Sequence, residues 1–217
     1  MQVAPVEDQT LEVVLFAEPG PQNTERTLEM GRRRLRALSL THVVVASDTG
    51  KTARRVLELY GADCSIIVVS NPAGLTLPLT KLHGYLPRFA AHRDALAQRG
   101  VPAVPVSLAV QDATALESAG AKVVRVDWQR FQAFTGSGLR SLDWFGVGVR
   151  VALTICVAAY LEGVLPADAE MLALAGTGFG GGGADTAVVV RSARRWPDWR
   201  LLEVLARPRV SPPTEVG

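Results

Sequence analysis

The sequence predicts one α/β domain in three layers, with helices on both faces of a mostly parallel central sheet. Strand-like and helix-like segments alternate along the chain, as in α/β proteins. Two predicted strands, Val43–Ala46 and Ser65–Val69, are continuous apolar runs typical of strands covered on both faces. The length of 217 residues and the 48% hydrophobic content suit one large domain. We expect it to span residues 11–208, between a flexible N-terminus (1–10) and a disordered tail (209–217).

The elements follow from periodicity and from the residues that end each run. We predict strands at Val13–Phe16, Val43–Ala46, Ser65–Val69, Val101–Val106, Met171–Ala175, Thr186–Val190 and Leu202–Ala206. We predict helices at Thr24–Leu38, Lys51–Tyr60 (closed by Gly61), Arg88–Gln98 and Leu139–Gly163. The strand at Val101–Val106 contains two prolines, which places it near an edge of the sheet. Residues Ser107–Gly138 carry no pattern that assigns them.

Composition excludes several classes of function. A net charge of +2 is far from that of a dedicated nucleic-acid binder, and Arg32, Arg33, Arg34 and Arg36 fit a solvated helix face better than a nucleic-acid patch. The segment Trp144–Leu161 is interrupted by Arg150, which indicates a buried helix rather than a membrane span.

The histidines and cysteines show no metal-binding pattern. His42, His83 and His92 lack the spacing of metal ligands, and Cys64 and Cys156 lack CxxC spacing and suit free thiols in a reducing cytoplasm. The first ten residues lack the features of a signal peptide. We therefore expect a cytoplasmic protein without a metal.

The turn after the second strand is a candidate phosphate site. It comprises Ser47, Asp48, Thr49, Gly50, Lys51 and Thr52. It is no nucleotide-kinase P-loop, because Val45 stands where that motif needs glycine. The free N–H groups at the start of a helix nevertheless favour an anion, and Lys51 opposes the helix dipole unless an anion lies there. The alternative is that Asp48 or Thr49 merely caps the helix.

A glycine-rich loop, GTGFGGGGAD, follows the strand that ends at Ala175. Gly176, Gly178 and Gly181 match G-x-G-x-x-G, but the next segment is strand-like, so the dinucleotide fold is not predicted. The loop either lets the backbone approach a ligand closely or is a flexible hairpin connection. In the first case Gly176, Thr177, Gly178, Asp185 and Thr186 would face the turn Ser47–Thr52, since ligands of parallel sheets lie beyond the carboxyl ends of the strands.

These segments resemble the C-terminal α/β domain of pyruvate kinase. VVVASDTGKTARRVLELYGADCSIIVVS is similar to its effector phosphate loop with the flanking strands, and MLALAGTGFGGGGADTAVVV to its closing glycine-rich loop. The chain resembles most a family of stand-alone, largely uncharacterised proteins of this kind. That resemblance also covers Glu18-Pro19-Gly20 and Asn23-Thr24, and so adds Glu18, Asn23 and Thr24 as further site candidates. It does not extend to Ser70–Leu75 or Ser107–Gly138.

Two functions follow as expectations. The first is a binding or regulatory protein for a small phosphorylated ligand: a nucleotide, flavin mononucleotide or a sugar phosphate. The second is an enzyme acting on a phosphate-containing substrate, with Glu18, Asp185 and Lys51 as candidates for its chemistry. The pyruvate kinase reaction itself is not expected, since its chemistry belongs to a barrel that this chain is too short to contain.

The long apolar helix predicts assembly. Between Trp144 and Leu161 apolar side chains point in every direction, whereas a surface helix needs only one apolar stripe. Gly146 and Gly148 suggest that another backbone packs closely there. We expect a homo-oligomer; the alternative is that Ser107–Gly138 folds over the outer face of this helix.

Overall fold

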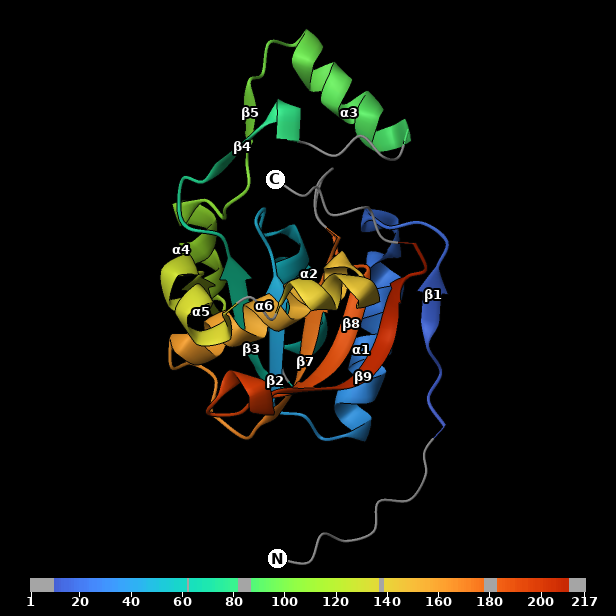
Figure 1. The fold of residues 1–217 in the computed structure, drawn as a ribbon, viewed down its shortest axis with the longest axis vertical. Coiled ribbons are helices and arrows are strands. Elements are labelled where there is room, and N and C mark those ends of the chain that lie inside the picture. Colours follow the sequence, from blue (N-terminus) through green and yellow to red (C-terminus); the bar gives the residue numbers. More distant parts are fainter. Residues whose placement is uncertain (1–9, 62, 82–86, 137–138, 178–182, 211–217) are drawn as a thin grey trace, which may run out of the picture.

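The computed structural model describes residues 10–61, 63–81, 87–136, 139–177 and 183–210, and its centre is a seven-stranded mixed sheet (Figure 1). The order is β1-β9-β8-β7-β2-β3-β6. The strands are β1 (Val14–Phe16), β2 (His42–Ala46), β3 (Ser65–Ser70), β6 (Lys122–Arg125), β7 (Glu170–Ala175), β8 (Thr186–Arg191) and β9 (Arg200–Pro208). Only β8 runs against the others in this sheet. The expected α/β class with a mostly parallel sheet is therefore confirmed.

Helices cover both faces of the sheet, and the side chains of β2 alternate between them. Val43 and Val45 pack in the cluster formed with α1 (Thr24–Ala37) and α2 (Lys51–Tyr60). Val44 packs on the opposite side, in the cluster formed with α6 (Val147–Leu161). Because both faces are apolar, β2 reads in the sequence as an unbroken apolar run.

The long helix predicted over Leu139–Gly163 is not continuous. A 3-10 helix, η3 (Arg140–Phe145), precedes α6, and the two meet at Gly146. Gly146 has φ 108°, a backbone conformation that glycine adopts far more readily than residues with a side chain. The prediction of one long helix was therefore wrong at its start.

The apolar helix α6 is buried largely by its own chain. The region that the sequence left unassigned forms α4 (Val110–Ser118), β6 and α5 (Trp128–Thr135), and α5 packs on α6. Tyr160 of α6 also meets the rings of Phe134 and Trp199, with centroids 5.7 and 5.8 Å apart. The region Ser107–Gly138 therefore helps to cover the helix, as the alternative to assembly required. The homo-oligomer stays a prediction, but an uncovered apolar face of α6 no longer supports it.

Gly148 of α6 lies against the first residue of β8. A β-carbon at this position would be 2.0 Å from Oγ1 of Thr186, the first residue of β8. The expected close neighbour is therefore present, but it is the side chain of Thr186 in the same chain and not another backbone.

An arm, which we define as residues 72–106, leaves the body between β3 and α4 (Figure 1). It contains β4 (Thr76–Pro78), the 3-10 helix η2 (Leu79–Lys81), α3 (Pro87–Gln98) and β5 (Ala103–Pro105). The strands β4 and β5 pair with each other in a separate antiparallel sheet. The prediction that Val101–Val106 is an edge strand of the central sheet was therefore wrong.

In the described part of the chain, no helix is long and apolar enough to cross a membrane. Cys156 is buried in α6 and Cys64 is half-buried, and both are free thiols. Burial raises the pKa of Cys64 to about 11. Two short 3-10 helices, η1 (Pro21–Asn23) and η4 (Trp196–Asp198), complete the described elements.

Candidate functional site

The turn and the glycine-rich loop leave the sheet at the same edge. β2 ends at Ala46 and β7 ends at Ala175, and the two strands are parallel neighbours with Val45 opposite Leu174. β8 begins at Thr186, directly opposite Ala175. The expectation that both loops open at one edge, beyond the carboxyl ends of the strands, is confirmed.

The turn Ser47–Thr52 starts α2 without a side-chain cap. Gly50 is the N-cap residue, with a left-handed φ of 75°, and no side chain accepts a capping hydrogen bond at this position. Ser47 Oγ accepts a hydrogen bond of 3.3 Å from the Ala53 N–H, inside the first turn. The alternative in which Asp48 or Thr49 caps the helix was therefore wrong. Ser47 satisfies the Ala53 N–H, while the N–H groups of Lys51 and Thr52 have no side-chain acceptor among the described residues.

Only part of the turn is accessible to a ligand. Thr49 and Lys51 are exposed, whereas Ser47 and Thr52 keep only 6% and 5% of their surface. Of the three hydroxyl groups that the sequence offered, Thr49 alone is on the surface. Lys51 has no acidic partner among the described residues, although its charge opposes the helix dipole.

A second cation lies at the same helix end. A β-carbon at Gly50 would be 3.0 Å from Nη1 of Arg54, so the guanidinium lies against the glycine. The same nitrogen is 3.1 Å from Oδ1 of Asp112, in the first turn of α4. Arg54 is thus an anion-binding candidate that the sequence analysis did not single out. Its position four residues after Gly50 could have indicated that it lies on the same side of the helix start.

Asp48 turns toward β3. Its Oδ1 accepts hydrogen bonds from the Ser70 hydroxyl (2.6 Å) and the Asn71 N–H (3.2 Å), and its Oδ2 accepts one from Asn71 Nδ2 (3.3 Å). Burial raises the pKa of Asp48, and these hydrogen bonds together with the charge of Arg125 oppose that rise. The carboxyl is therefore held by β3, so its charge is not directed at the start of α2.

Asp185 lies in a second polar cluster, enclosed by the fold. Its carboxylate accepts hydrogen bonds from the Gly20 N–H (2.8 Å), the Thr177 hydroxyl (2.7 Å) and the Thr186 hydroxyl (3.0 Å). Thr177, Asp185 and Thr186 keep 3% or less of their surface. Burial is the main cause that raises the pKa of Asp185. We call these four residues the Asp185 cluster.

The other candidates near this cluster hold backbone in place. Thr24 Oγ1 donates to the Pro21 carbonyl (2.7 Å) and accepts from the Ala184 N–H (3.1 Å). Asn23 Nδ2 donates to the Glu18 carbonyl (2.7 Å). The EPG-xx-NT segment therefore fastens the start of α1 to the end of the glycine-rich loop.

The structure does not bring all predicted site residues together. Thr177, Asp185 and Thr186 bond one another, and no described hydrogen bond joins them to the turn Ser47–Thr52, so their facing the turn stays a prediction. Gly176 follows β7 at the same edge, and Gly178 lies outside the described residues. Of the three residues proposed for chemistry, Asp185 is enclosed, while Glu18 and Lys51 are exposed.

Sequence reasoning missed three residues around Asp48: Ser70, Asn71 and Arg125. The first two are polar residues at the end of a buried strand, which was a usable signal. Arg125 donates to the carbonyls of Leu108 (2.7 Å) and Asn71 (3.3 Å). It ends β6, a strand that the sequence did not show, so its position could not have been foreseen.

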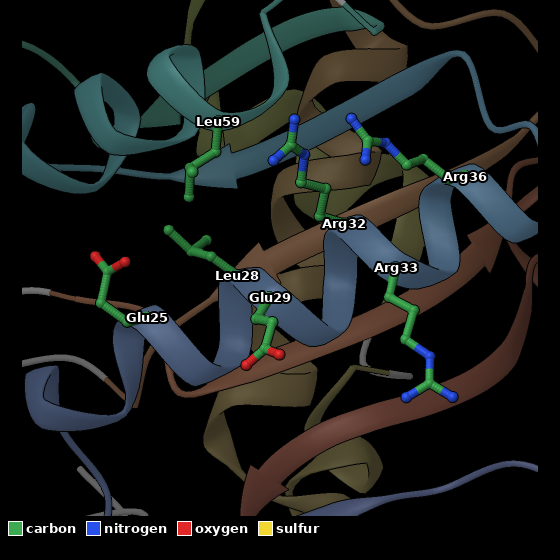
Figure 2. A pocket seen from close by; sticks show the side chains of 7 residues that line it. All are labelled: Glu25, Leu28, Glu29, Arg32, Arg33, Arg36 and Leu59. Carbon is green, nitrogen blue, oxygen red and sulfur yellow. The ribbon is translucent and has the colours of Figure 1, made fainter.

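Two hollows lie elsewhere, along α1. One of about 430 Å³ is an open groove between α1 and α2 (Figure 2). It is lined by Glu25, Leu28, Glu29, Arg32, Arg33, Arg36 and Leu59. Figure 2 shows Arg32 and Arg36 reaching toward α2. Both lie within 4 Å of Asp63, at 3.8 and 3.0 Å.

The other two arginines of this run are also paired. Arg33 lies 3.7 Å from Glu12, and Arg34 makes a bidentate pair with Glu203 of β9. These pairs support the interpretation of the run as a solvated helix face, because its positive charge is already balanced by acids of the same chain.

Histidine, cysteine and acidic side chains form no group able to hold a metal ion within the described residues. His42 is half-buried and hydrogen-bonded to the neighbouring Thr41 hydroxyl, and burial lowers its pKa. His92 is exposed on α3, and His83 lies outside the described residues. Among protein families, no family model matches the chain.

Proposed function

We propose that this chain is a binding or regulatory protein for a small phosphorylated ligand, whose phosphate is held at the start of α2. One observation carries the proposal: α2 begins at Gly50 with no side-chain acceptor for its first two N–H groups. Lys51, which has no acidic partner among the described residues, and the guanidinium of Arg54 lie at this helix end. Backbone N–H groups, the positive end of the helix dipole and two cations together favour a dianion. Thr49 supplies an exposed hydroxyl donor.

Three further features support this function. Asp48, which would repel a phosphate, is engaged by Ser70 and Asn71. The loop between β7 and β8 starts at the same sheet edge, one strand away. The chain resembles the three-layer α/β domain of pyruvate kinase and the stand-alone family of that kind. This resemblance implies a phosphate site at the same strand-turn-helix. A nucleotide, flavin mononucleotide and a sugar phosphate share the required chemistry, and a cytoplasmic homo-oligomer fits the proposal.

Thermal unfolding with and without inorganic phosphate tests the site. A ligand at about 100 times its Kd adds roughly 2.7 kcal/mol to the free energy of unfolding. We expect Lys51→Glu to abolish this stabilisation, because it replaces the free cation with a repelling charge. Lys81→Glu, the same change at an exposed lysine of the arm, should leave it intact. Equal responses of both variants and the wild type would contradict the proposed site.

An enzyme acting on a phosphate-containing substrate is the second candidate. Of the residues expected for its chemistry, Lys51 is exposed and lies at the proposed site, in the first turn of α2. Native mass spectrometry of freshly purified protein would identify a co-purifying ligand. Incubation with that compound then separates the two functions: a binding protein returns it unchanged, and an enzyme converts it.

A further inference from the structure

Among the described residues, the hydrogen bonds that fasten the arm to the body lie in one small region, its root. We define the root as Ser70, Asn71, Val106 and Leu108, where the chain leaves β3 and returns toward α4. Asn71 Nδ2 donates to the Val106 carbonyl (2.9 Å), and the Leu108 N–H donates to Ser70 Oγ (2.8 Å). Each bond joins the outgoing segment to the returning one, so the root closes the arm into a loop.

Beyond the root the arm has little support. The described side chains of α3, from Ala90 to Gln98, are all half-buried or exposed. Figure 1 shows α3 standing away from the central sheet. An isolated two-stranded sheet and a 12-residue helix are each marginally stable in water. The direction of the arm therefore depends on the hydrogen bonds of its root.

Asp48 is where the root meets the turn before α2. Its carboxylate holds the Ser70 hydroxyl and both nitrogens of Asn71, while its own backbone leads directly into Thr49 and Gly50. A displacement of this turn by a bound phosphate moves the Asp48 backbone, and with it the acceptor that three root donors share.

A second connection runs in parallel. Arg54, whose guanidinium lies against Gly50, forms an ion pair with Asp112 in the first turn of α4. α4 begins two residues after Leu108 of the root. An anion at Gly50 competes with Asp112 for this guanidinium, so it also bears on the helix that follows the arm.

We propose that Asp48 is a positioning residue that couples the occupancy of the α2 phosphate site to the attachment of the arm. This inference rests on the proposed function, since it needs an anion at the turn. Coupling of this kind requires that the ligand bind two arrangements of one element with different affinity. The root is that element: its hydrogen bonds are either closed on Asp48, as in this structure, or opened when the turn is displaced. The arm then reports the bound state to whatever it contacts.

Hydrogen exchange of the full chain, with inorganic phosphate as the probe, tests the coupling. Where a segment cannot open locally while the ligand is bound, a ligand at a concentration of ten times its Kd slows amide exchange about tenfold. In the wild type we expect slowing at residues 49–54 and exchange at least threefold faster at 71–75 and 106–109, because the root hydrogen bonds open. In Asp48→Asn, which keeps one of the two acceptor oxygens, slowing at 49–54 should persist and the change at the root should weaken.

Control variants separate the possible failures. Asp127→Asn changes an acid that caps α5 outside the root, and it should respond as the wild type does. Ser70→Ala removes one root donor and should weaken the root response if Asp48→Asn folds poorly. Slowing at 49–54 without a root response in the wild type overturns the coupling and leaves the phosphate site standing. A root response that persists at full size in both root variants also overturns it, and no slowing at 49–54 refutes the phosphate site itself.

Discussion

Two carboxylates lie at the same edge of the sheet and are used differently. Asp185 keeps 1% of its surface and joins three separate segments through Gly20, Thr177 and Thr186. Asp48 is half-buried and bonds only its neighbours at the end of β3. Both pKa values are raised by burial. An acid beside a glycine-rich loop can thus serve to close the fold, while the hydrogen-bond donors proposed for a ligand lie at the turn before α2.

Removing the two carboxylates should have unequal effects. Asp185→Ala leaves three buried donors without an acceptor, and we expect it to lower the free energy of unfolding by about 3 kcal/mol or more. Asp48→Ala leaves one buried donor, the Ser70 hydroxyl, without this acceptor, while Asn71 is half-buried and water can replace the carboxylate there, so about 1–2 kcal/mol is expected. Denaturant unfolding of both variants measures the difference. Equal losses in the free energy of unfolding would show that the two acids stabilise the fold to the same extent.

The contact beside the Asp185 cluster gives the next largest effect. Gly148→Ala would place a β-carbon 2.0 Å from Thr186 Oγ1 and 2.8 Å from its Cβ. The strand and α6 must separate, and a cost of about 2–3 kcal/mol follows from overpacking of this kind. Val151→Ala, one turn along the same helix at a half-buried position, serves as the control and should cost less. If the Gly148→Ala protein unfolds at the same temperature as the wild type, α6 and β8 are not in contact at this position.

A smaller effect is the dependence of stability on pH. Because burial raises the pKa of Asp185, the folded protein holds this proton more tightly than the unfolded chain does. The free energy of unfolding should then fall as the pH rises from about 4 through the folded-state pKa. Asp185→Asn removes this contribution, so its stability should depend less on pH over that interval. Unfolding measured at a series of pH values checks the slope; a steeper decline in the variant would contradict the assignment.

Much of the fold could be predicted because the central strands are recognisable in the sequence. β2, β3, β7 and β8 are buried on both faces and are therefore continuous apolar runs. The predicted bounds of α2, Lys51 to Tyr60, are those observed. The region 107–138 could not be assigned because β6 has a single fully buried residue, Val124, and reads KVVR.

The candidate site was only partly predictable. The position of the turn followed from the strand-turn-helix pattern, because a parallel strand and its helix place that turn at the carboxyl edge. The direction in which each side chain points did not follow. Asp48 looked like a helix cap, yet the Ser70 hydroxyl and Asn71 compete for it from a neighbouring strand. Thr177 and Asp185 looked like ligand contacts, yet they satisfy each other.

Mapping of amide chemical shifts by NMR during titration with inorganic phosphate tests the central claim most directly. The described structure offers free N–H groups at the start of α2 and enclosed ones in the Asp185 cluster. We predict that the amides of residues 49–52 show the largest saturable shifts, while those of Thr177, Asp185 and Thr186 change little. The largest shifts in the Asp185 cluster, or in the groove between α1 and α2, would contradict the account, as would the absence of any saturable shift.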